Sequence, residues 1–194
     1  MPSETNNEMH PTEVNPYPLV WIDCEMTGLD CNKDRIIEIA CFITNKALKL
    51  LDLNGFETAV SCEQSLLDGM DEWCTTTHTN SGLIERVKIA PSSADVENKL
   101  LAYLRRFLPR RKGLLAGNTV HQDLAFLRVQ FPRVCELLHY RILDVSTIKE
   151  IGLRINPSLM GKQVRKKNNH TAKSDILESI QELQFYYDHF FIRR

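Results

Sequence analysis

The sequence predicts an α/β fold in which a mixed sheet is flanked by helices. Short apolar segments rich in β-favouring residues come first along the chain. After them, segments with apolar residues at helical spacing alternate with short apolar segments typical of buried strands. The chain of 194 residues is 43% hydrophobic and 25% charged, and is long enough to bury a sizeable core. We therefore expect a single domain over residues 17–194, preceded by a disordered polar tail over residues 1–16.

The first three predicted strands form an antiparallel meander. Residues 19–25 are apolar and β-favouring at the start and polar at the end, which is typical of a buried strand. Residues 36–43 form a second such segment. A third falls within residues 50–60, where Asn54-Gly55 fits a turn between short strands. The lengths of these segments fit a meander of three strands.

Helices and further strands alternate in the rest of the chain. The apolar residues within 96–108 have helical spacing, and the short apolar segment 114–117 predicts a buried strand that leads into a helix. Residues 141–144 and 145–153 repeat this order of strand and helix, and a last helix begins near Asp175. The whole order predicts a sheet that joins the antiparallel meander to parallel strands, with helices packed against it.

Composition excludes several classes of protein. Because 24 Lys and Arg oppose 25 Asp and Glu, the chain does not carry the basic field of a protein that coats long nucleic acid. No apolar segment approaches the roughly 18 residues of a membrane helix. The six cysteines form no CxxC pair, which disfavours a zinc site or a disulfide framework. Residues 1–16 contain three glutamates and no arginine, unlike a mitochondrial presequence, so we expect a cytoplasmic location.

Asp23 and Glu25 are the first candidate metal ligands. They stand two residues apart on the first predicted strand, so their side chains share one face. Two carboxylates at the end of an apolar strand repel each other unless a cation lies between them, and Mg²⁺ or Mn²⁺ prefers such oxygen ligands. The spacing alone is a weak signal, because Asp95 and Glu97 repeat it on a predicted helix, where we expect both to be solvated. A metal site and an ordinary acid pair therefore both remain open at this point.

Two further acids and one histidine occupy suggestive places. Asp123 follows the predicted strand 114–117 where the next helix begins, and active sites in α/β sheets cluster at such strand ends. Asp175 also opens a helix. For both acids, the alternative is a structural role at a helix N-terminus. His170 lies in a polar, basic segment, where an exposed histidine would titrate near neutral pH and serve as a general base, or be an ordinary surface residue.

Taken together, these residues indicate one kind of chemistry. Four carboxylates can hold two divalent ions about 3.5–4 Å apart, one activating water and one stabilising the leaving oxygen during phosphodiester cleavage. The histidine would take the proton of the attacking water.

Four segments of the chain resemble one known family. They are Asp-Cys-Glu-Met-Thr-Gly-Leu-Asp (23–30), Gly-Asn-Thr-Val-His-Gln-Asp (117–123), Tyr-Arg-Ile-Leu-Asp-Val-Ser-Thr (140–147) and His-Thr-Ala-Lys-Ser-Asp (170–175). In this order they closely resemble the oligoribonucleases, which belong to the DEDDh group of 3′-to-5′ exonucleases with a ribonuclease H-like fold. The resemblance extends from about residue 19 to residue 187, and the pair His121-Gln122 is similar to the eukaryotic branch.

The resemblance implies specific roles for residues that spacing alone does not assign. It makes Asp23, Glu25, Asp123 and Asp175 the ligands of two Mg²⁺ or Mn²⁺ ions, and His170 the general base. It implies that Trp73 and His78 contact the substrate and that Leu29 lies against a base. It further implies that Thr119, Arg141 and Ser146 close around a 5′ phosphate, and that Tyr140 reaches into the partner's site in a homodimer.

The substrate class that the resemblance implies is single-stranded RNA of about two to five nucleotides, dinucleotides foremost, because a closed phosphate pocket leaves no room for a longer 5′ side. Nucleoside 5′-monophosphates would be the products. An exonuclease of the same group that acts on longer RNA or DNA 3′ ends is the first alternative. A binding protein that retains the fold without catalysis is the second. Relatives that occur in mitochondria make that organelle the alternative to the cytoplasm.

Overall fold

A computed structural model describes residues 18–109, 111–162 and 171–191. The polar tail expected over residues 1–16 lies outside these described residues, and so does His170.

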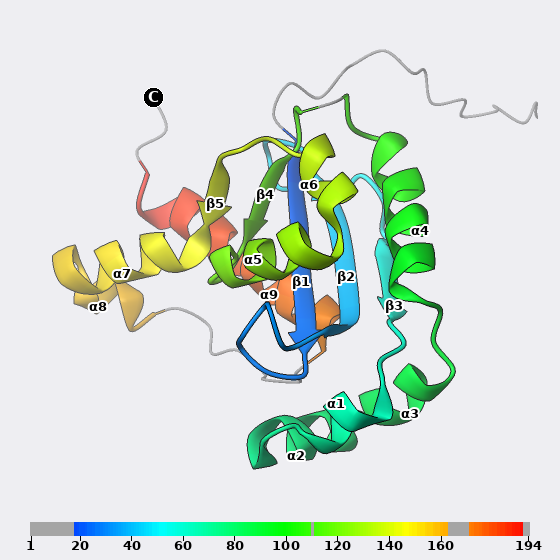
Figure 1. The fold of residues 1–194 in the computed structure, drawn as a ribbon. Helices are drawn as coiled ribbons and strands as arrows, with labels where there is room; N and C mark the ends of the chain where they lie inside the picture. The colour runs from blue at the N-terminus through cyan, green and yellow to red at the C-terminus, as the bar shows by residue number, and fades with distance from the viewer. Residues whose placement is uncertain (1–17, 110, 163–170, 192–194) are drawn as a thin grey trace, which may run out of the picture.

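Five strands form one mixed sheet in the order β3-β2-β1-β4-β5 (Figure 1). Their bounds are β1 Leu19–Met26, β2 Ile36–Thr44, β3 Phe56–Ala59, β4 Leu114–Gly117 and β5 Ile142–Asp144. The pairs β1–β2 and β2–β3 are antiparallel, whereas β1–β4 and β4–β5 are parallel. The predicted combination of a meander with parallel strands is therefore confirmed, with β1 at the centre of the sheet.

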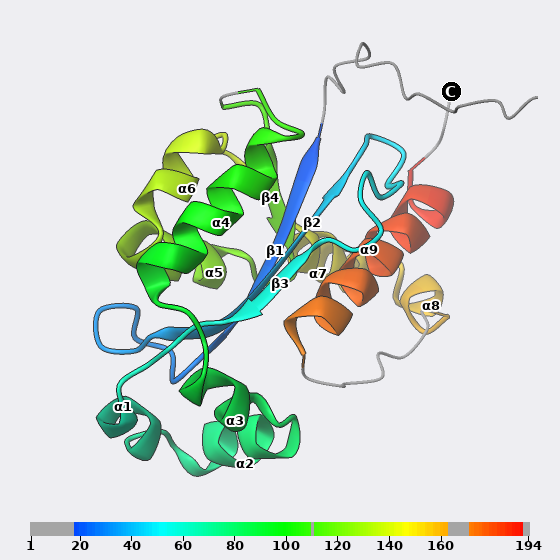
Figure 2. The same ribbon diagram turned by 90° about the vertical axis from the view of Figure 1, so that its right-hand side faces the viewer.

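Helices cover both faces of the sheet, and three short helices lie beyond one end of it (Figure 2). Their bounds are α1 Gln64–Asp68, α2 Glu72–Asn80, α3 Leu83–Lys88, α4 Ser93–Arg105, α5 His121–Gln130, α6 Pro132–Leu137, α7 Val145–Ile155, α8 Pro157–Met160 and α9 Ala172–His189. One face packs against α4, α5 and α6, and the other against α7 and α9. Among the described residues, no helix combines the length and apolar character needed to cross a membrane.

The alternation of side chains along β1 decides where its acids point. Val20, Ile22 and Cys24 are buried in the core beneath α4 and α5. Trp21 belongs to the opposite core, beneath α9, and its indole N–H donates to Thr44 Oγ1 at 2.9 Å. Because successive side chains of a strand point to opposite faces, Asp23 and Glu25 follow Trp21 onto the face that α9 covers.

Some elements differ from expectation. The third strand is confined to Phe56–Ala59, while Leu50 makes an isolated bridge with Thr44. The short helices α1, α2 and α3 had no periodic signal, because a stretch such as Glu72–Asn80 is polar almost throughout. The expectation that Glu97 is solvated is wrong. Its carboxylate is buried against α6 and accepts the backbone N–H of Arg133 at 2.8 Å and its Nε at 2.7 Å.

Candidate active site

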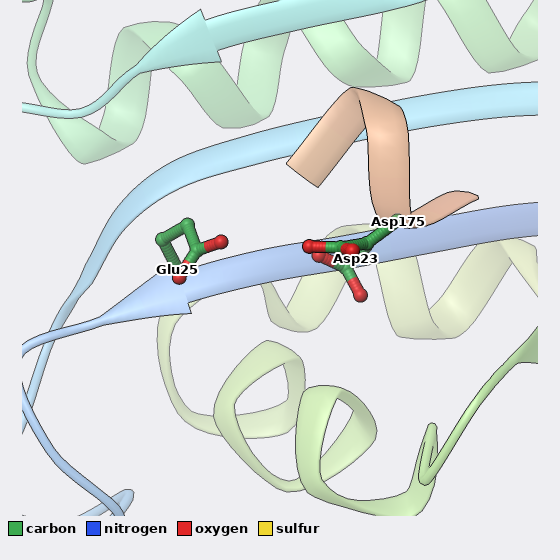
Figure 3. A group of neighbouring side chains, drawn as sticks. All are labelled: Asp23, Glu25 and Asp175. Atoms are coloured by element: carbon green, nitrogen blue, oxygen red, sulfur yellow. The ribbon is translucent and has the colours of Figure 1, made fainter. Parts of the chain in front are cut away.

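Three of the predicted metal ligands lie together at the end of β1. Asp23 and Glu25 project from this strand, and Asp175 projects toward them from α9 (Figure 3). Each offers one carboxylate oxygen such that all three atoms lie within 4.8 Å of one another. Three hard oxygen donors this close form a suitable set for a divalent cation.

The first turn of α9 is fixed by capping and by the sheet. Thr171 is the N-cap, and its hydroxyl accepts the backbone N–H of Ser174 at 3.4 Å. Glu38 of β2 accepts the backbone N–H of Ala172 at 3.4 Å. The apolar side chains of Ile176, Ile180 and Leu183 then bury this helix against the sheet. Asp175 therefore reaches β1 because the helix that carries it is docked at its first turn.

Asp123 occupies a different position from the other three acids. It lies in the first turn of α5, is only 6% exposed, and accepts the backbone N–H of Cys24 at 3.0 Å. This bond ties Asp123 to the strand residue between Asp23 and Glu25. It is not among the three acids within 4.8 Å of one another.

Burial and mutual repulsion make the ionised acids unfavourable without a cation. Burial, followed by repulsion from Asp175, Glu38 and Asp123, raises the pKa of Glu25 to about 8. Burial also raises the pKa of Asp123 to about 7, although the Cys24 N–H opposes that shift. A bound divalent cation would offset this repulsion, so the donor set fits a metal ion on both geometric and electrostatic grounds.

His78 lies behind Glu25. Its side chain is 1% exposed, and its Nε2–H donates to the carbonyl oxygen of Met26 at 2.9 Å. Its Nδ1 is 4.0 Å from Glu25 Oε2. Burial lowers the pKa of His78. The predicted contact of His78 with substrate would therefore need a movement of α2 or of the β1–β2 loop, because the ring is enclosed by protein.

Three large apolar side chains predicted to contact substrate or partner are exposed. Leu29 is 82% exposed, Trp73 62% and Tyr140 77%. Hydrogen bonds within the loop connect the residues on either side of Leu29, because Asp34 accepts the hydroxyl of Thr27 at 3.1 Å and the backbone N–H of Asp30 at 2.8 Å. Their exposure to solvent would allow contact with a base or with a second chain.

The predicted phosphate-binding hydroxyls lie where β4 and β5 end. Thr119 has a φ of 55°, which is strained for a β-branched residue. It is held there because its N–H donates to Asp144 Oδ1 at 2.9 Å and to Ser146 Oγ at 3.0 Å. The guanidinium of Arg141 lies 5.4 Å from the Tyr140 ring centroid. The carboxyl ends of the neighbouring parallel strands β4 and β5 thus bring Thr119 and Ser146 to one edge, whereas Arg141 directly precedes β5 at its amino end.

Sequence reasoning missed two residues of the site. Glu38 is a buried acid opposite Glu25 in the β1–β2 register, and its carboxylate pairs with Arg86 of α3 at 2.5 Å. A lone acid in an otherwise apolar strand was the available signal. Asn118 directly follows β4 and bonds to α9. Its place between a buried strand and Thr119 was the only hint.

Comparison with known proteins shows the family of this chain. A family model described as RNase_T, exonuclease, matches residues 20–183. The chain is therefore an exonuclease of the RNase_T family.

Individual relatives narrow the class. A protein named probable oligoribonuclease from Schizosaccharomyces pombe is 47% identical over 171 residues, covering 87% of this chain and 67% of that relative. The oligoribonuclease of Haemophilus ducreyi is 47% identical over 173 residues, covering 89% of this chain and 93% of that relative. The chain belongs to the oligoribonucleases.

Solved structures confirm the ribonuclease H-like fold. Escherichia coli exonuclease I in complex with a dA16 oligonucleotide matches with a TM-score of 0.69 at 13% identity, over 89% of this chain and 41% of that one. At this identity the likeness concerns the fold.

Proposed function

We propose that the chain is a metal-dependent 3′-to-5′ exoribonuclease that hydrolyses short single-stranded RNAs, dinucleotides foremost, to nucleoside 5′-monophosphates. The observation that carries this proposal is the cluster of Asp23, Glu25 and Asp175 within 4.8 Å at the end of the central strand. The membership of the chain in the oligoribonucleases supports the same proposal.

Two Mg²⁺ or Mn²⁺ ions would be held by four acids, namely the three clustered ones and Asp123. When bound, these ions would supply activation of water and stabilisation of the leaving oxygen. The chain's own acids set the geometry: β1 fixes two carboxylates on one face, and the docked first turn of α9 brings the third. His170 would accept the proton of the attacking water.

The remaining predicted residues would hold the RNA. Leu29 and Trp73 offer exposed apolar surfaces on which bases stack, a contact that tolerates any base. Thr119, Arg141 and Ser146 would bind the terminal 5′ phosphate. A near-neutral chain gains little from long-range attraction to RNA, so local binding of one phosphate by a guanidinium and hydroxyls supports a short substrate.

We also propose a homodimer in which Tyr140 completes the partner's site. Its exposed ring and the exposed apolar residues Ile151, Leu153 and Ile155 of α7 support a protein interface. Mixing tests the role in trans: inactive Tyr140→Ala and Asp175→Asn variants should restore activity when they form heterodimers. No recovery in verified heterodimers would refute it.

Product analysis on 5′-labelled RNAs of about two to ten nucleotides, with Mg²⁺ or EDTA, tests the function. We expect rapid, metal-dependent loss of the dinucleotide and slow loss of longer RNAs. Equal or faster cleavage of longer RNAs would support the alternative of a general exonuclease. No cleavage of any length would indicate a binding protein.

Arg141→Ala separates the two nuclease hypotheses further. A phosphate pocket that depends on Arg141 predicts a loss of about tenfold or more in kcat/KM for a 5′-phosphorylated dinucleotide. An open channel predicts little change on the same substrate. The compartment we propose is the cytoplasm, with the mitochondrion as the alternative because a Saccharomyces cerevisiae relative is named a mitochondrial oligoribonuclease. Fractionation of cells that express the tagged chain distinguishes the two.

A further inference from the structure

Asn118 joins three elements of the site. Its Nδ2 donates to Ser179 Oγ at 2.8 Å and to Glu182 Oε2 at 3.0 Å, both on α9. Its Oδ1 accepts the hydroxyl of Ser146, on the first turn of α7, at 3.0 Å. One side chain at the end of β4 therefore connects the helix of Asp175 to the predicted phosphate-binding hydroxyls.

The chemistry of the neighbours fixes which way the amide points. Ser179 gives its only hydroxyl hydrogen to the carbonyl oxygen of Asp175 at 2.7 Å, so its oxygen is left to accept. The other carboxylate oxygen of Glu182 accepts the hydroxyl of Tyr186 at 2.8 Å. If the amide were reversed, its oxygen would face two acceptors. The NH₂ group must therefore face α9, and the oxygen must face Ser146.

This orientation determines what each hydroxyl can do. The hydrogen of Ser146 is committed to Asn118, and the oxygen of Ser146 accepts the backbone N–H of Thr119 at 3.0 Å. The hydroxyls of Thr119 and Ser146 are 3.2 Å apart, and Thr119 is then the donor in that contact. The exposed Thr119 hydroxyl can turn toward a phosphate at the loss of one long hydrogen bond, whereas Ser146 cannot without releasing Asn118.

We propose that Asn118 is a positioning residue that fixes the distance between the phosphate-binding end of the site and its metal-binding end. It acts through Ser146 and Thr119 at the first end, and through Ser179 and the backbone of Asp175 at the second. This inference rests on the proposed function. In this view, the enzyme selects a 5′-phosphorylated dinucleotide in two ways. Side chains contact the phosphate, and the hydrogen bonds of Asn118 hold those side chains at a fixed distance from the acids.

The test compares Asn118→Ala, Ser146→Ala and the double variant on 5′-phosphorylated and 5′-hydroxyl diribonucleotides. Wild type should prefer the phosphorylated substrate in kcat/KM. Asn118→Ala should lower this preference by about fivefold or more, because an unsupported Ser146 no longer holds Thr119 in place. The double variant should be no worse than the more impaired single variant, since both substitutions break the same chain of contacts.

Two further variants guard against a folding defect. Asn98→Ala removes an exposed asparagine of α4 and should leave both substrates unaffected. Tyr186→Phe removes only the hydroxyl that orients Glu182, so it should lower the phosphate preference in the same direction by a smaller factor. Thermal unfolding of every variant gives the folded fraction.

Equal losses on the two substrates, or additive effects in the double variant, would show that Asn118 has only a structural role. A wild type that cleaves both dinucleotides without preference would overturn the inference and leave the exonuclease intact. If wild type cleaves neither, the proposed function fails by itself, and the same ratio is measured by equilibrium binding with Ca²⁺ in place of Mg²⁺. An unchanged binding ratio in Asn118→Ala would then overturn the inference separately.

Discussion

The site has two regions that are built in opposite ways. The acidic end, defined as Asp23, Glu25, Asp123 and Asp175, is partly buried and held by a central strand and the first turns of two helices. The contact residues, defined as Leu29, Trp73 and Tyr140, are large apolar side chains exposed to solvent. The first region is ordered by the core before any ligand arrives, at an electrostatic cost. The second gains its contacts only from substrate or partner. Substitutions should therefore separate chemistry from binding.

The largest effect is expected at the acidic end. Asp175→Asn keeps the size of the side chain but removes one of three clustered carboxylates, so kcat should fall by about 10³-fold or more. Because the substitution also removes repulsion, the metal-free protein should be at least as stable as wild type in urea unfolding. Activity that survives in the purified variant would refute the proposed mechanism.

The second largest effect is expected at His170, the proposed general base. His170→Ala should lower kcat by about 10²-fold or more with little change in KM, because proton transfer is affected and RNA binding is not. Rates at saturating dinucleotide measure this. His189→Ala, at an exposed histidine in the last turn of α9, is the matched control and should retain most of kcat. Equal kcat losses in the two variants would contradict the role of His170.

The electrostatic cost of the acidic end predicts how stability depends on pH. The pKa of Glu25 is raised to about 8 and that of Asp123 to about 7, while the unfolded chain releases these protons near pH 4. Between these values the folded state holds more protons, so its stability falls as pH rises. In EDTA, the free energy of unfolding should be lower at about pH 8.5 than at pH 5.5 by roughly 2 kcal/mol or more.

Urea unfolding at both pH values measures this difference in the free energy of unfolding. Addition of Mg²⁺ at the higher pH should restore the stability that is lost there. Glu25→Gln removes one of the raised groups and should flatten the profile. If wild-type protein in EDTA is equally stable at both pH values, the raised pKa values of Glu25 and Asp123 do not lower its free energy of unfolding, and the prediction is wrong.

The smallest effect is expected at Trp73, one of the contact residues. Trp73→Ala should raise KM by about tenfold, the equivalent of one lost stacking contact, with kcat and stability nearly unchanged. Initial rates over a range of dinucleotide concentrations measure both constants. A fall in kcat with constant KM would mean that Trp73 belongs functionally with the acidic end, and would contradict the division of the site into two regions.

Local sequence patterns placed much of this site. The sequence predicted the apolar strand before Asp23 and the short buried strand before Asp123, because a run of apolar residues along one strand is a local pattern. The alternation of β1 also predicted that Asp23 and Glu25 share a face. The approach of Asp175 to that face depends on how α9 packs, which only the family resemblance indicated.

Other features depend on distant partners, which local sequence patterns do not identify. Glu97 pairs with Arg133 of another helix, and Glu38 pairs with Arg86. These ion pairs offset the cost of burying the two carboxylates. The amide of Asn118 acquires its role from residues on α9. Such pairings are decided by tertiary packing, so neither periodicity nor spacing could reveal them.

The distribution of the acidic end along the chain has a consequence for synthesis. Asp23 belongs to β1, whereas Asp175 belongs to α9, which follows the other described strands and helices along the chain and packs against this strand. A nascent chain emerging from the ribosome therefore lacks one of the clustered acids until α9 has been made. The enzyme would thus remain inactive on RNA near the ribosome until α9 has emerged and packed on β1.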